Sequence, residues 1–395
     1  MTNHRRQSRR EFLLTSTVGF VGLTCAKPAV SREESPLDNE LLYVGTYTDD
    51  GKSKGIYLVR MDTRSGQLEL TGSVDAGENP SYLAIHPSGR VLYAVNEVDR
   101  YSGKASGSVT AFAIARDTGT ISRLTTRPSE GAAPCYISVD RSGRVVLVAN
   151  YNGGSVALLP IQTDGLLTPA TSVIHHQGSG PDKDRQSESH AHCIITDPSN
   201  RYALAADLGA DRVFIYRLDF GGLSLYPVKG EAAMPAGAGP RHIVFHPTLP
   251  LVFVANELDS SVATLLFDDE HGKLTPIDSR STLPSGWTGK NYPADIHVAP
   301  SGDALYVSNR GHNSIAVFSV KPTGALALEQ TVSTDGDWPR NFSIDPTGRW
   351  LLAANQRSNS IVVFAREEGS GRLTPTPQRL ELPSPVCLRF RAHAG

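Results

Sequence analysis

The chain has 395 residues and a formal net charge of -2 at pH 7, with 36 glycines, 26 prolines and 3 tryptophans. This length allows two domains or one large all-β unit, and the abundance of turn-forming glycine and proline favours many short strands. The charge balance excludes the basic surface by which proteins bind nucleic acid or anionic lipid. The four cysteines have no CxxC spacing and predict neither a zinc site nor a disulfide framework.

Residues 1–30 are typical of an export signal rather than of a folded domain. The pair Arg9 and Arg10 precedes a weakly apolar stretch at 13–26, and this order predicts a twin-arginine signal. The apolar stretch is shorter than the roughly 20 residues that span a bilayer. The sequence therefore predicts an exported, periplasmic or extracytoplasmic protein without a membrane span after signal removal. A lipoprotein anchored through Cys25 is the alternative, disfavoured because the preceding residues make a poor lipobox.

After a predicted linker at residues 31–40, one segment of about fifty residues recurs along the chain. Its shared part is a turn such as Pro-Ser-Gly-Arg, followed by a short apolar strand that usually ends in asparagine. The copies are HPSGRVLYAVN (86–96), DRSGRVVLVAN (140–150), DPSNRYALAAD (197–207), HPTLPLVFVAN (246–256), APSGDALYVSN (299–309) and DPTGRWLLAAN (345–355). A seventh copy of the strand alone, LLYVGT, stands at 41–46.

Each copy is followed by another strand-like run, a turn with glycine, and a more polar strand. Four alternating strands per repeat, without helical periodicity, are typical of a propeller blade, so the sequence predicts a seven-bladed β-propeller over residues 41–395. The N-terminal blade lacks its innermost strand, and SPVCLRFRA (384–392) is expected to supply it by pairing with 41–46. A two-sheet sandwich is the alternative, but it does not require seven near-equal repeats.

Propeller geometry converts a position in the repeat into a position in space. The innermost strand begins at the face where the second strand ends, so residues at these two places surround one mouth of the channel. The innermost-strand starts are Ser81, Cys135, His192, Arg241, Ala294, Arg340 and Val386, and the positions after the second strands are Tyr47, Glu97, Tyr151, Leu208, Glu257, Arg310 and Gln356. The set predicted to converge is His192, Arg241, Glu257, Arg310, Arg340 and Glu97, with His190, Tyr151 and Gln356 as further substrate contacts.

Other polar residues of the repeats are expected to be structural. His86 and His246 stand where other copies have a turn-capping aspartate, and the strand-end asparagines recur in nearly every blade, as scaffold groups do. His242 and His297 lie within innermost strands and are interpreted as buried and hydrogen-bonded. The segment 177–189, QGSGPDKDRQSES, is longer than its counterparts and could form a lid.

A histidine, a carboxylate and several arginines around a wet pocket suit an anionic, oxygen-rich substrate. Arginine binds carboxylate or phosphate through paired hydrogen bonds and stabilises the oxyanion of a tetrahedral ester intermediate. Histidine or glutamate can activate water as a general base. The absence of a Gly-x-Ser-x-Gly segment disfavours a serine nucleophile. His190 and His192 could ligate a metal, but neighbouring arginines would repel a cation, so neither a metal nor a cofactor is expected.

A resemblance to a known family stands beside this interpretation. The segments SHAHCIITDPSNR (189–201), GAGPRHIVFHP (237–247) and VANELDSSVATL (254–265), together with 94–112, 148–161, 293–320 and 338–364, resemble the seven-bladed lactonase family. That family includes the propeller type of 6-phosphogluconolactonase and is similar to the fungal carboxymuconate lactonizing enzyme. The resemblance runs from about residue 41 to the C-terminus, in every blade. It implies an active site made of His192, Arg241, Glu257 and Arg310.

The sequence therefore predicts a monomeric lactonase for a small sugar-acid lactone, phosphorylated or not, with no nucleic-acid partner. Glu257 or His192 is expected to activate water, while Arg241 and Arg310 bind the carbonyl oxygen or anionic groups. Because the chain carries an export signal, a lactone outside the cytoplasm fits better than a cytosolic intermediate. Two alternatives stay open: a muconate-type lactonizing cycloisomerase, and a non-catalytic propeller that serves as a binding platform and shows an apolar patch on one face.

Overall fold

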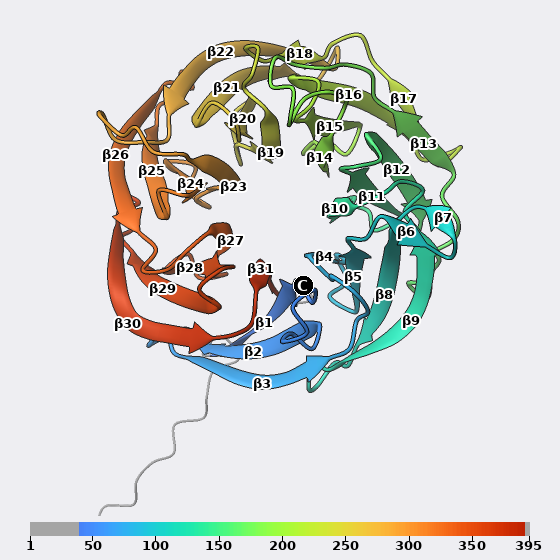
Figure 1. Ribbon diagram of the computed structural model, residues 1–395, viewed down its shortest axis with the longest axis horizontal. Coiled ribbons are helices and arrows are strands. Elements are labelled where there is room, and N and C mark those ends of the chain that lie inside the picture. The colour runs from blue at the N-terminus through green and yellow to red at the C-terminus, as the bar shows by residue number, and fades with distance from the viewer. Residues whose placement is uncertain (1–38, 392–395) are drawn as a thin grey trace, which may run out of the picture. The chain divides into compact units, whose positions relative to one another are not determined.

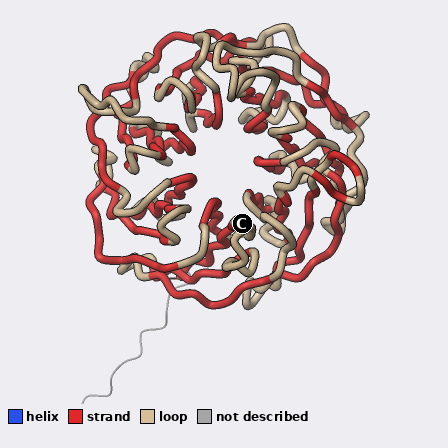
Figure 2. Tube along the Cα trace, in the orientation of Figure 1, coloured by secondary structure: helices blue, strands red, loops and turns tan. Residues whose placement is uncertain are grey.

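The computed structural model describes residues 39–391, which form a ring of seven β-sheets around a central axis (Figure 1). All regular elements of these residues are strands joined by loops and turns, with no helix among them (Figure 2). The predicted seven-bladed β-propeller is confirmed. The expected export signal at 1–30, with Cys25, lies outside the described residues. Within 39–391, no helix is long and apolar enough to cross a bilayer.

Each blade is a sheet of antiparallel strands that runs outward from the channel. The innermost strands are β31 (Pro385–Phe390), β4 (Tyr82–Ile85), β10 (Pro134–Val139), β14 (Ala191–Thr196), β19 (Pro240–Phe245), β23 (Tyr292–Val298) and β27 (Pro339–Ile344), in blades one to seven. The second strands are β1 (Asn39–Thr46), β5 (Val91–Asn96), β11 (Val145–Asn150), β15 (Tyr202–Asp207), β20 (Leu251–Asn256), β24 (Ala304–Arg310) and β28 (Trp350–Asn355).

The third strands are β2 (Ile56–Asp62), β8 (Ser108–Ile114), β12 (Ser155–Pro160), β16 (Arg212–Asp219), β21 (Ser261–Asp268), β25 (Ser314–Val320) and β29 (Ser360–Arg366). The outermost strands are β3 (Leu68–Val74), β9 (Ile121–Pro128), β13 (Ser172–His175), β17 (Ser224–Pro227), β22 (Lys273–Ser281), β26 (Leu326–Ser333) and β30 (Leu373–Glu381). A short strand β18 (Ala232–Ala233) also pairs with β16, and a hairpin of β6 (Arg100–Tyr101) and β7 (Lys104–Ala105) projects from blade two.

Strands from the two ends of the described chain close the ring. In blade one β31 pairs antiparallel with β1, with Leu42 opposite Phe390, and the sheet order is β3-β2-β1-β31. This is the pairing predicted from the missing innermost strand. Because β1 begins at Asn39, the last two residues of the expected 31–40 linker belong to the first blade.

The hydrophobic core lies between blades. The second strands are covered on both faces by neighbouring blades, and all six residues of β5 are buried. The outermost strands have one face in water, as the alternation of exposed and partly buried residues in β30 shows. The apolar runs of the repeat are thus the strands that contribute most of the hydrophobic stabilisation.

In five of the blades one side chain fixes the turn before the second strand, and this residue is an aspartate or a histidine. In blade three Asp140 accepts hydrogen bonds from the backbone N–H of Ser142 (2.8 Å) and Val145 (2.7 Å). His86 and His246 take the place of this aspartate: their Nδ1 atoms accept from backbone N–H groups two residues on, and their Nε2 atoms contact carbonyl oxygens of the next blade. Their predicted structural role is confirmed.

The strand-end asparagines join the second strands to the loops around them. Asn150, Asn309 and Asn355 each donate from Nδ2 to a backbone carbonyl of the loop that leads into the blade, at 2.9 to 3.1 Å. Repetition of the same bond in several blades is the mark of a scaffold group, and their expected structural role is confirmed.

Candidate active site

In several blades, an irregularity in the pairing of the first two strands turns one side chain toward the mouth of the propeller. In blade three Pro134 pairs with Asn150 and Tyr136 pairs with Ala149, so Cys135 has no partner. Such a β-bulge turns the side chain of the extra residue out of the regular alternation. The same register shift leaves out His192, Arg241 and Arg340. Cys135, His192, Arg241 and Arg340, all predicted at the starts of innermost strands, therefore lie at bulges just inside these strands.

The second set of predicted residues follows the ends of the second strands. The backbone N–H groups of Glu97, Tyr151 and Glu257 each donate to a carbonyl of the loop before the innermost strand, at 2.7 to 3.0 Å. This bond brings the two repeat positions together at one mouth. The resulting open pocket has a volume of about 340 Å³ and is lined by Tyr47, Glu97, Cys135, Tyr151, Arg185, His192, Glu257, Arg310 and Arg340.

Three residues predicted for the site do not line this pocket. Arg241 is buried below the pocket, with its Nε atom 3.0 Å from Oε2 of Glu257. His190 lies behind Tyr151, with the two rings stacked at a centroid distance of 4.5 Å. Gln356 lines a separate surface hollow with Tyr47. The structure thus brings His192, Glu257, Arg310, Glu97, Arg340 and Tyr151 together and places the other three around them.

Glu257 is the centre of an arginine cluster. Its Oε1 lies 2.6 Å from Nη2 of Arg185, and its Oε2 lies 2.6 Å from Nη2 of Arg310 and 3.0 Å from Nε of Arg241. Burial alone would raise the pKa of Glu257, but Arg310, Arg241 and Arg185 together hold this pKa far below its ordinary value. Both oxygens are occupied and the carboxylate holds no proton, so Glu257 is poorly suited to accept one. This geometry makes it the counterion that orients the arginines.

Arg185 was not predicted as a site residue. It comes from the 177–189 segment that was expected to form a lid, and its Nη2 atom also lies 3.2 Å from the hydroxyl of Tyr151. The neighbouring Gln186 anchors the segment, because its buried Nε2 donates to the carbonyl of Leu208 (2.8 Å) and to Asp211 (2.7 Å). The unusual length of the segment was the only signal, since no other repeat offers an equivalent position.

His192 is a neutral imidazole on the pocket wall. Burial, and then the nearby charge of Arg241, holds the pKa of His192 well below its ordinary value. Its Nδ1 atom lies 3.6 Å from Sγ of Cys135, and its ring meets Tyr151 edge-on at 5.4 Å. A neutral ring can donate or accept a hydrogen bond to a substrate hydroxyl, but its low proton affinity makes it a weak base.

A series of hydrogen-bonded side chains from the innermost strands β19 and β23 supports Arg241. Nδ1 of His242 lies 2.8 Å from Oδ1 of Asp295, and Nε2 of His242 lies 3.2 Å from Nη1 of Arg241. The Nδ1–H group of His242 donates a hydrogen bond to the carboxylate of Asp295. The unprotonated Nε2 atom is then free to accept a hydrogen bond from the guanidinium of Arg241. His297 binds the other carboxylate oxygen at 3.0 Å and is partly buried. The interpretation of His242 and His297 as hydrogen-bonded structural residues is confirmed, and this series of side chains orients the arginine that contacts Glu257.

Buried, neutral His242 predicts an acid-sensitive fold. Burial, and then Arg241, lowers the pKa of His242 from 6.5 to about 3. Between pH 6.5 and about pH 3, His242 is protonated in the unfolded chain but not in the folded protein. This residue therefore makes the free energy of unfolding fall by about 1.4 kcal/mol for each pH unit of acidification. We expect His242→Gln to flatten this dependence in urea titrations, with the exposed His175→Gln as the matched control. An unchanged slope in His242→Gln would contradict the prediction.

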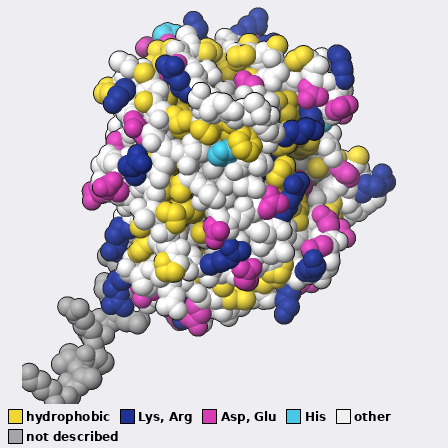
Figure 3. All heavy atoms as spheres, turned by 60° about the vertical axis from the view of Figure 1, so that its left-hand side comes forward, with side chains coloured by type: hydrophobic (Ala, Val, Ile, Leu, Met, Phe, Trp, Pro, Cys, Tyr) yellow, Lys and Arg dark blue, Asp and Glu magenta, His cyan; other side chains and the backbone are white. Residues whose placement is uncertain are grey.

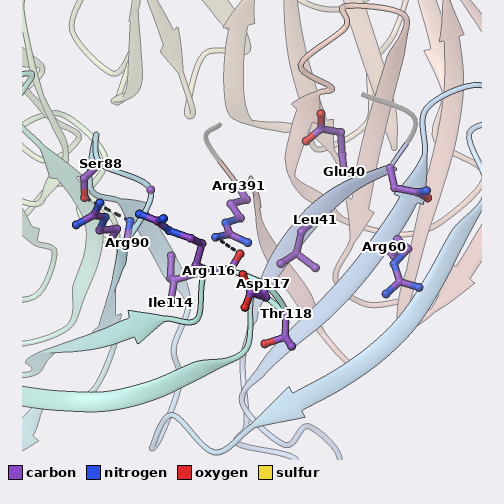
Figure 4. A pocket seen from close by; sticks show the side chains of 12 residues that line it. Glu40, Leu41, Arg60, Ser88, Arg90, Ile114, Arg116, Asp117, Thr118 and Arg391 are labelled. Atoms are coloured by element: carbon purple, nitrogen blue, oxygen red, sulfur yellow. Dashed lines mark hydrogen bonds between the residues drawn. The ribbon is translucent and has the colours of Figure 1, made fainter. Parts of the chain in front are cut away.

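A larger pocket, of about 440 Å³, lies between blades one and two, where β1 and β5 begin (Figure 4). Tyr47 and Glu97 of the smaller pocket follow the other ends of these two strands. The larger pocket is lined by the start of β1 and by Arg60, Arg90, Arg116 and Arg391, and Arg391 donates to the carbonyl of Arg116 at 2.9 Å. Its described lining contains no histidine and no bulge residue. The converging residues of the repeat therefore point to the smaller pocket. Across residues 39–391, no three His, Cys, Asp or Glu side chains lie close enough to hold a metal ion.

The chain is similar to known proteins over nearly the whole propeller. Residues 41–390 match the family model described as lactonase, 7-bladed beta-propeller. The 6-phosphogluconolactonase of Bacillus subtilis strain 168 is 38% identical over 349 residues, which cover 88% of this chain and 97% of that protein. The 6-phosphogluconolactonase of Formosa agariphila is 34% identical over 294 residues, covering 73% and 81%. The solved structure of the periplasmic gluconolactonase of Pseudomonas aeruginosa has a TM-score of 0.83 and 35% identity, covering 90% and 99%.

Proposed function

The chain belongs to the seven-bladed β-propeller lactonase family, and we propose that it hydrolyses the ring ester of a sugar-acid lactone with an activated water molecule. One observation carries the proposal: three arginines, two glutamates and a neutral histidine line one open pocket at the channel mouth. Relatives named as lactonases, similar over most of their length, support the reaction type. The roles of the individual residues below are part of this proposal.

Arg310 has the geometry of an oxyanion-binding group. Its Nη2 atom contacts Glu257, its Nε donates to the carbonyl of Tyr292 at 3.1 Å, and the guanidinium lies 5.4 Å from the centre of the Trp338 ring. Its Nη1 atom has no hydrogen-bond partner within residues 39–391. An arginine held on three sides can receive a developing negative charge without reorganising, and such preorganisation is the main source of electrostatic catalysis.

The charges of the pocket suit an acidic or hydroxyl-rich ligand. Arg185, Arg310 and Arg340 outnumber Glu97 and Glu257 in the lining, so the pocket carries an excess of positive charge. We propose an aldonolactone as the substrate class. The predicted export signal favours an unphosphorylated lactone outside the cytoplasm, and the name of the periplasmic relative supports that preference.

The test is acid release from δ-gluconolactone and from 6-phosphogluconolactone, each measured against its spontaneous hydrolysis in the same buffer. We expect the purified protein to accelerate hydrolysis of δ-gluconolactone, with a larger kcat/KM than for the phosphorylated lactone. Carboxymuconate, followed by its ultraviolet absorbance, is the control for a lactonizing reaction and is expected to remain unchanged. Neither lactone being hydrolysed faster than the blank would overturn the proposal.

The distribution of apolar side chains does not support a binding platform. Exposed large apolar residues stand mainly on outermost strands of different blades, among them Leu70, Leu124, Tyr226, Ile277 and Leu328. Acidic and basic side chains are interspersed over the face in Figure 3. A platform for a protein partner would gather the apolar side chains into one patch. We also propose that the protein acts as a monomer, and light scattering that gives the mass of a single chain, at most 42.4 kDa, would support this.

The twin-arginine hypothesis makes its own prediction. Changing Arg9 and Arg10 to lysine keeps the charge but removes the paired guanidinium groups that define this signal. We expect the doubly changed protein to stay in the cytoplasm while the unchanged protein is exported, as measured by immunoblots of cell fractions. Export of both proteins to the same extent would contradict the hypothesis.

A further inference from the structure

We propose that Glu97, rather than Glu257 or His192, is the general base that takes a proton from the attacking water. This assignment rests on the lactone hydrolysis proposed above. It deepens that proposal by naming the catalytic carboxylate and the place of the water.

The two pocket carboxylates are held in different ways. Oε2 of Glu97 accepts hydrogen bonds from the hydroxyl of Tyr47 (2.9 Å) and from Oγ of Ser81 (2.5 Å). Its Oε1 receives no hydrogen bond from any residue in 39–391. Glu257, by contrast, has both oxygens in contact with arginines. Only Glu97 is therefore fixed along one edge while the other edge is open to the pocket.

Arg340 faces this open edge. Its Nη2 atom lies 4.0 Å from Oε1 of Glu97, which is too long for a hydrogen bond and suits an oxygen atom held between the two groups. The guanidinium lies 5.3 Å from the centre of the Tyr47 ring, and its side chain is 17% exposed. It contacts no hydrogen-bond acceptor within residues 39–391. A largely buried guanidinium without an acceptor points to a ligand oxygen at this place.

The reaction follows from these positions. The water oxygen forms a bond to the carbonyl carbon of the lactone while one water proton moves to Oε1 of Glu97. The π electron pair of the carbonyl moves to its oxygen, and Arg310 stabilises the resulting oxyanion. The tetrahedral intermediate then collapses, the bond between the carbon and the ring oxygen breaks, and that oxygen takes the proton from Glu97. The product is the open hydroxy acid, and Glu97 returns to its ionised form.

Tyr47 and Ser81 are positioning residues in this scheme. Their hydroxyl groups hold Oε2 and so aim Oε1 at the water. His192 lines the pocket beside Cys135. In this scheme it binds a substrate hydroxyl, a role that agrees with its low proton affinity.

The test compares Glu97→Gln with Glu69→Gln, the same change at an exposed position of β3. We expect Glu97→Gln to lower kcat by about 10²- to 10⁴-fold, the usual contribution of a general base, with KM within about threefold of the unchanged protein. Glu69→Gln is expected to keep full activity. We also expect formate to restore activity to Glu97→Ala, because a small carboxylate can occupy the space and accept the proton.

The outcomes separate this assignment from the proposed function. An active unchanged protein with an active Glu97→Gln variant overturns the assignment alone, and so does a Glu97→Ala variant that formate does not restore. An unchanged protein that hydrolyses no lactone overturns both proposals. If Glu97→Gln does not fold, Glu97→Asp carries the test, because withdrawing the base by about 1 Å should lower kcat by up to about 10²-fold. Full activity in that variant would also overturn the assignment.

Discussion

Replacement of Glu257 by glutamine is expected to lower the free energy of unfolding by about 3–5 kcal/mol, the usual result of removing one partner of a buried ion pair. The side chains of Arg241 and Arg310 are 2% and 6% exposed, so a neutral amide leaves two buried guanidinium groups without their counterion. The arginines then lose their orientation, and we expect kcat/KM to fall by at least about 10³-fold. Urea unfolding and lactone hydrolysis measure the two effects on the same preparation.

Arg185→Gln is the matched control for Glu257→Gln. Arg185 contacts the same carboxylate at 2.6 Å, but its side chain is 34% exposed. Its removal leaves Glu257 with two buried partners, and we expect a loss of stability below about 1 kcal/mol. Formate is expected to leave Glu257→Ala inactive, since this carboxylate orients arginines and does not take the proton. A Glu257→Gln protein as stable as the unchanged one would contradict the counterion role.

Replacement of Arg310 by methionine is expected to lower kcat/KM by about 10²- to 10³-fold, the usual effect of losing one oxyanion donor. Methionine keeps the packing of the long side chain against Trp338 but has no donor for the oxyanion. Because the interaction strengthens only as negative charge develops, most of the loss should occur in kcat rather than in KM.

Arg357→Met is the control for this change. Arg357 also stacks on Trp338, at 3.5 Å from the ring centre, but it is exposed and does not line the pocket. We expect this variant to retain activity. Equal losses in both variants would show that packing on Trp338, and not oxyanion binding, accounts for the effect of Arg310.

The fold and the rim of the site could be predicted because the repeat relates each blade to the next. A residue such as His192 or Arg310 has an equivalent in every copy, so its position relative to the channel follows from the repeat alone. The closure of blade one by β31 followed for the same reason. Arg185 could not be predicted, since its segment has no counterpart in the other blades.

The repeat also could not predict how deeply each site residue is buried or which side chains it contacts. Glu97 and Glu257 occupy the same repeat position, yet Glu97 meets Tyr47 of blade one and Ser81 of its own blade, whereas Glu257 meets three arginines. The repeat likewise places Arg241 at the rim but does not show that Glu257 covers it. These differences arise in part from side chains of other blades, such as Tyr47 beside Glu97 and Arg310 beside Glu257, which no single repeat contains.

The initial rate of acid release from δ-gluconolactone, measured for the unchanged protein and for Arg310→Met at equal concentration, tests the central claim that this pocket hydrolyses lactones. The account predicts a rate above spontaneous hydrolysis for the unchanged protein and a rate close to the blank for the variant. Equal rates for the two proteins, whether both fast or both at the blank, would contradict it.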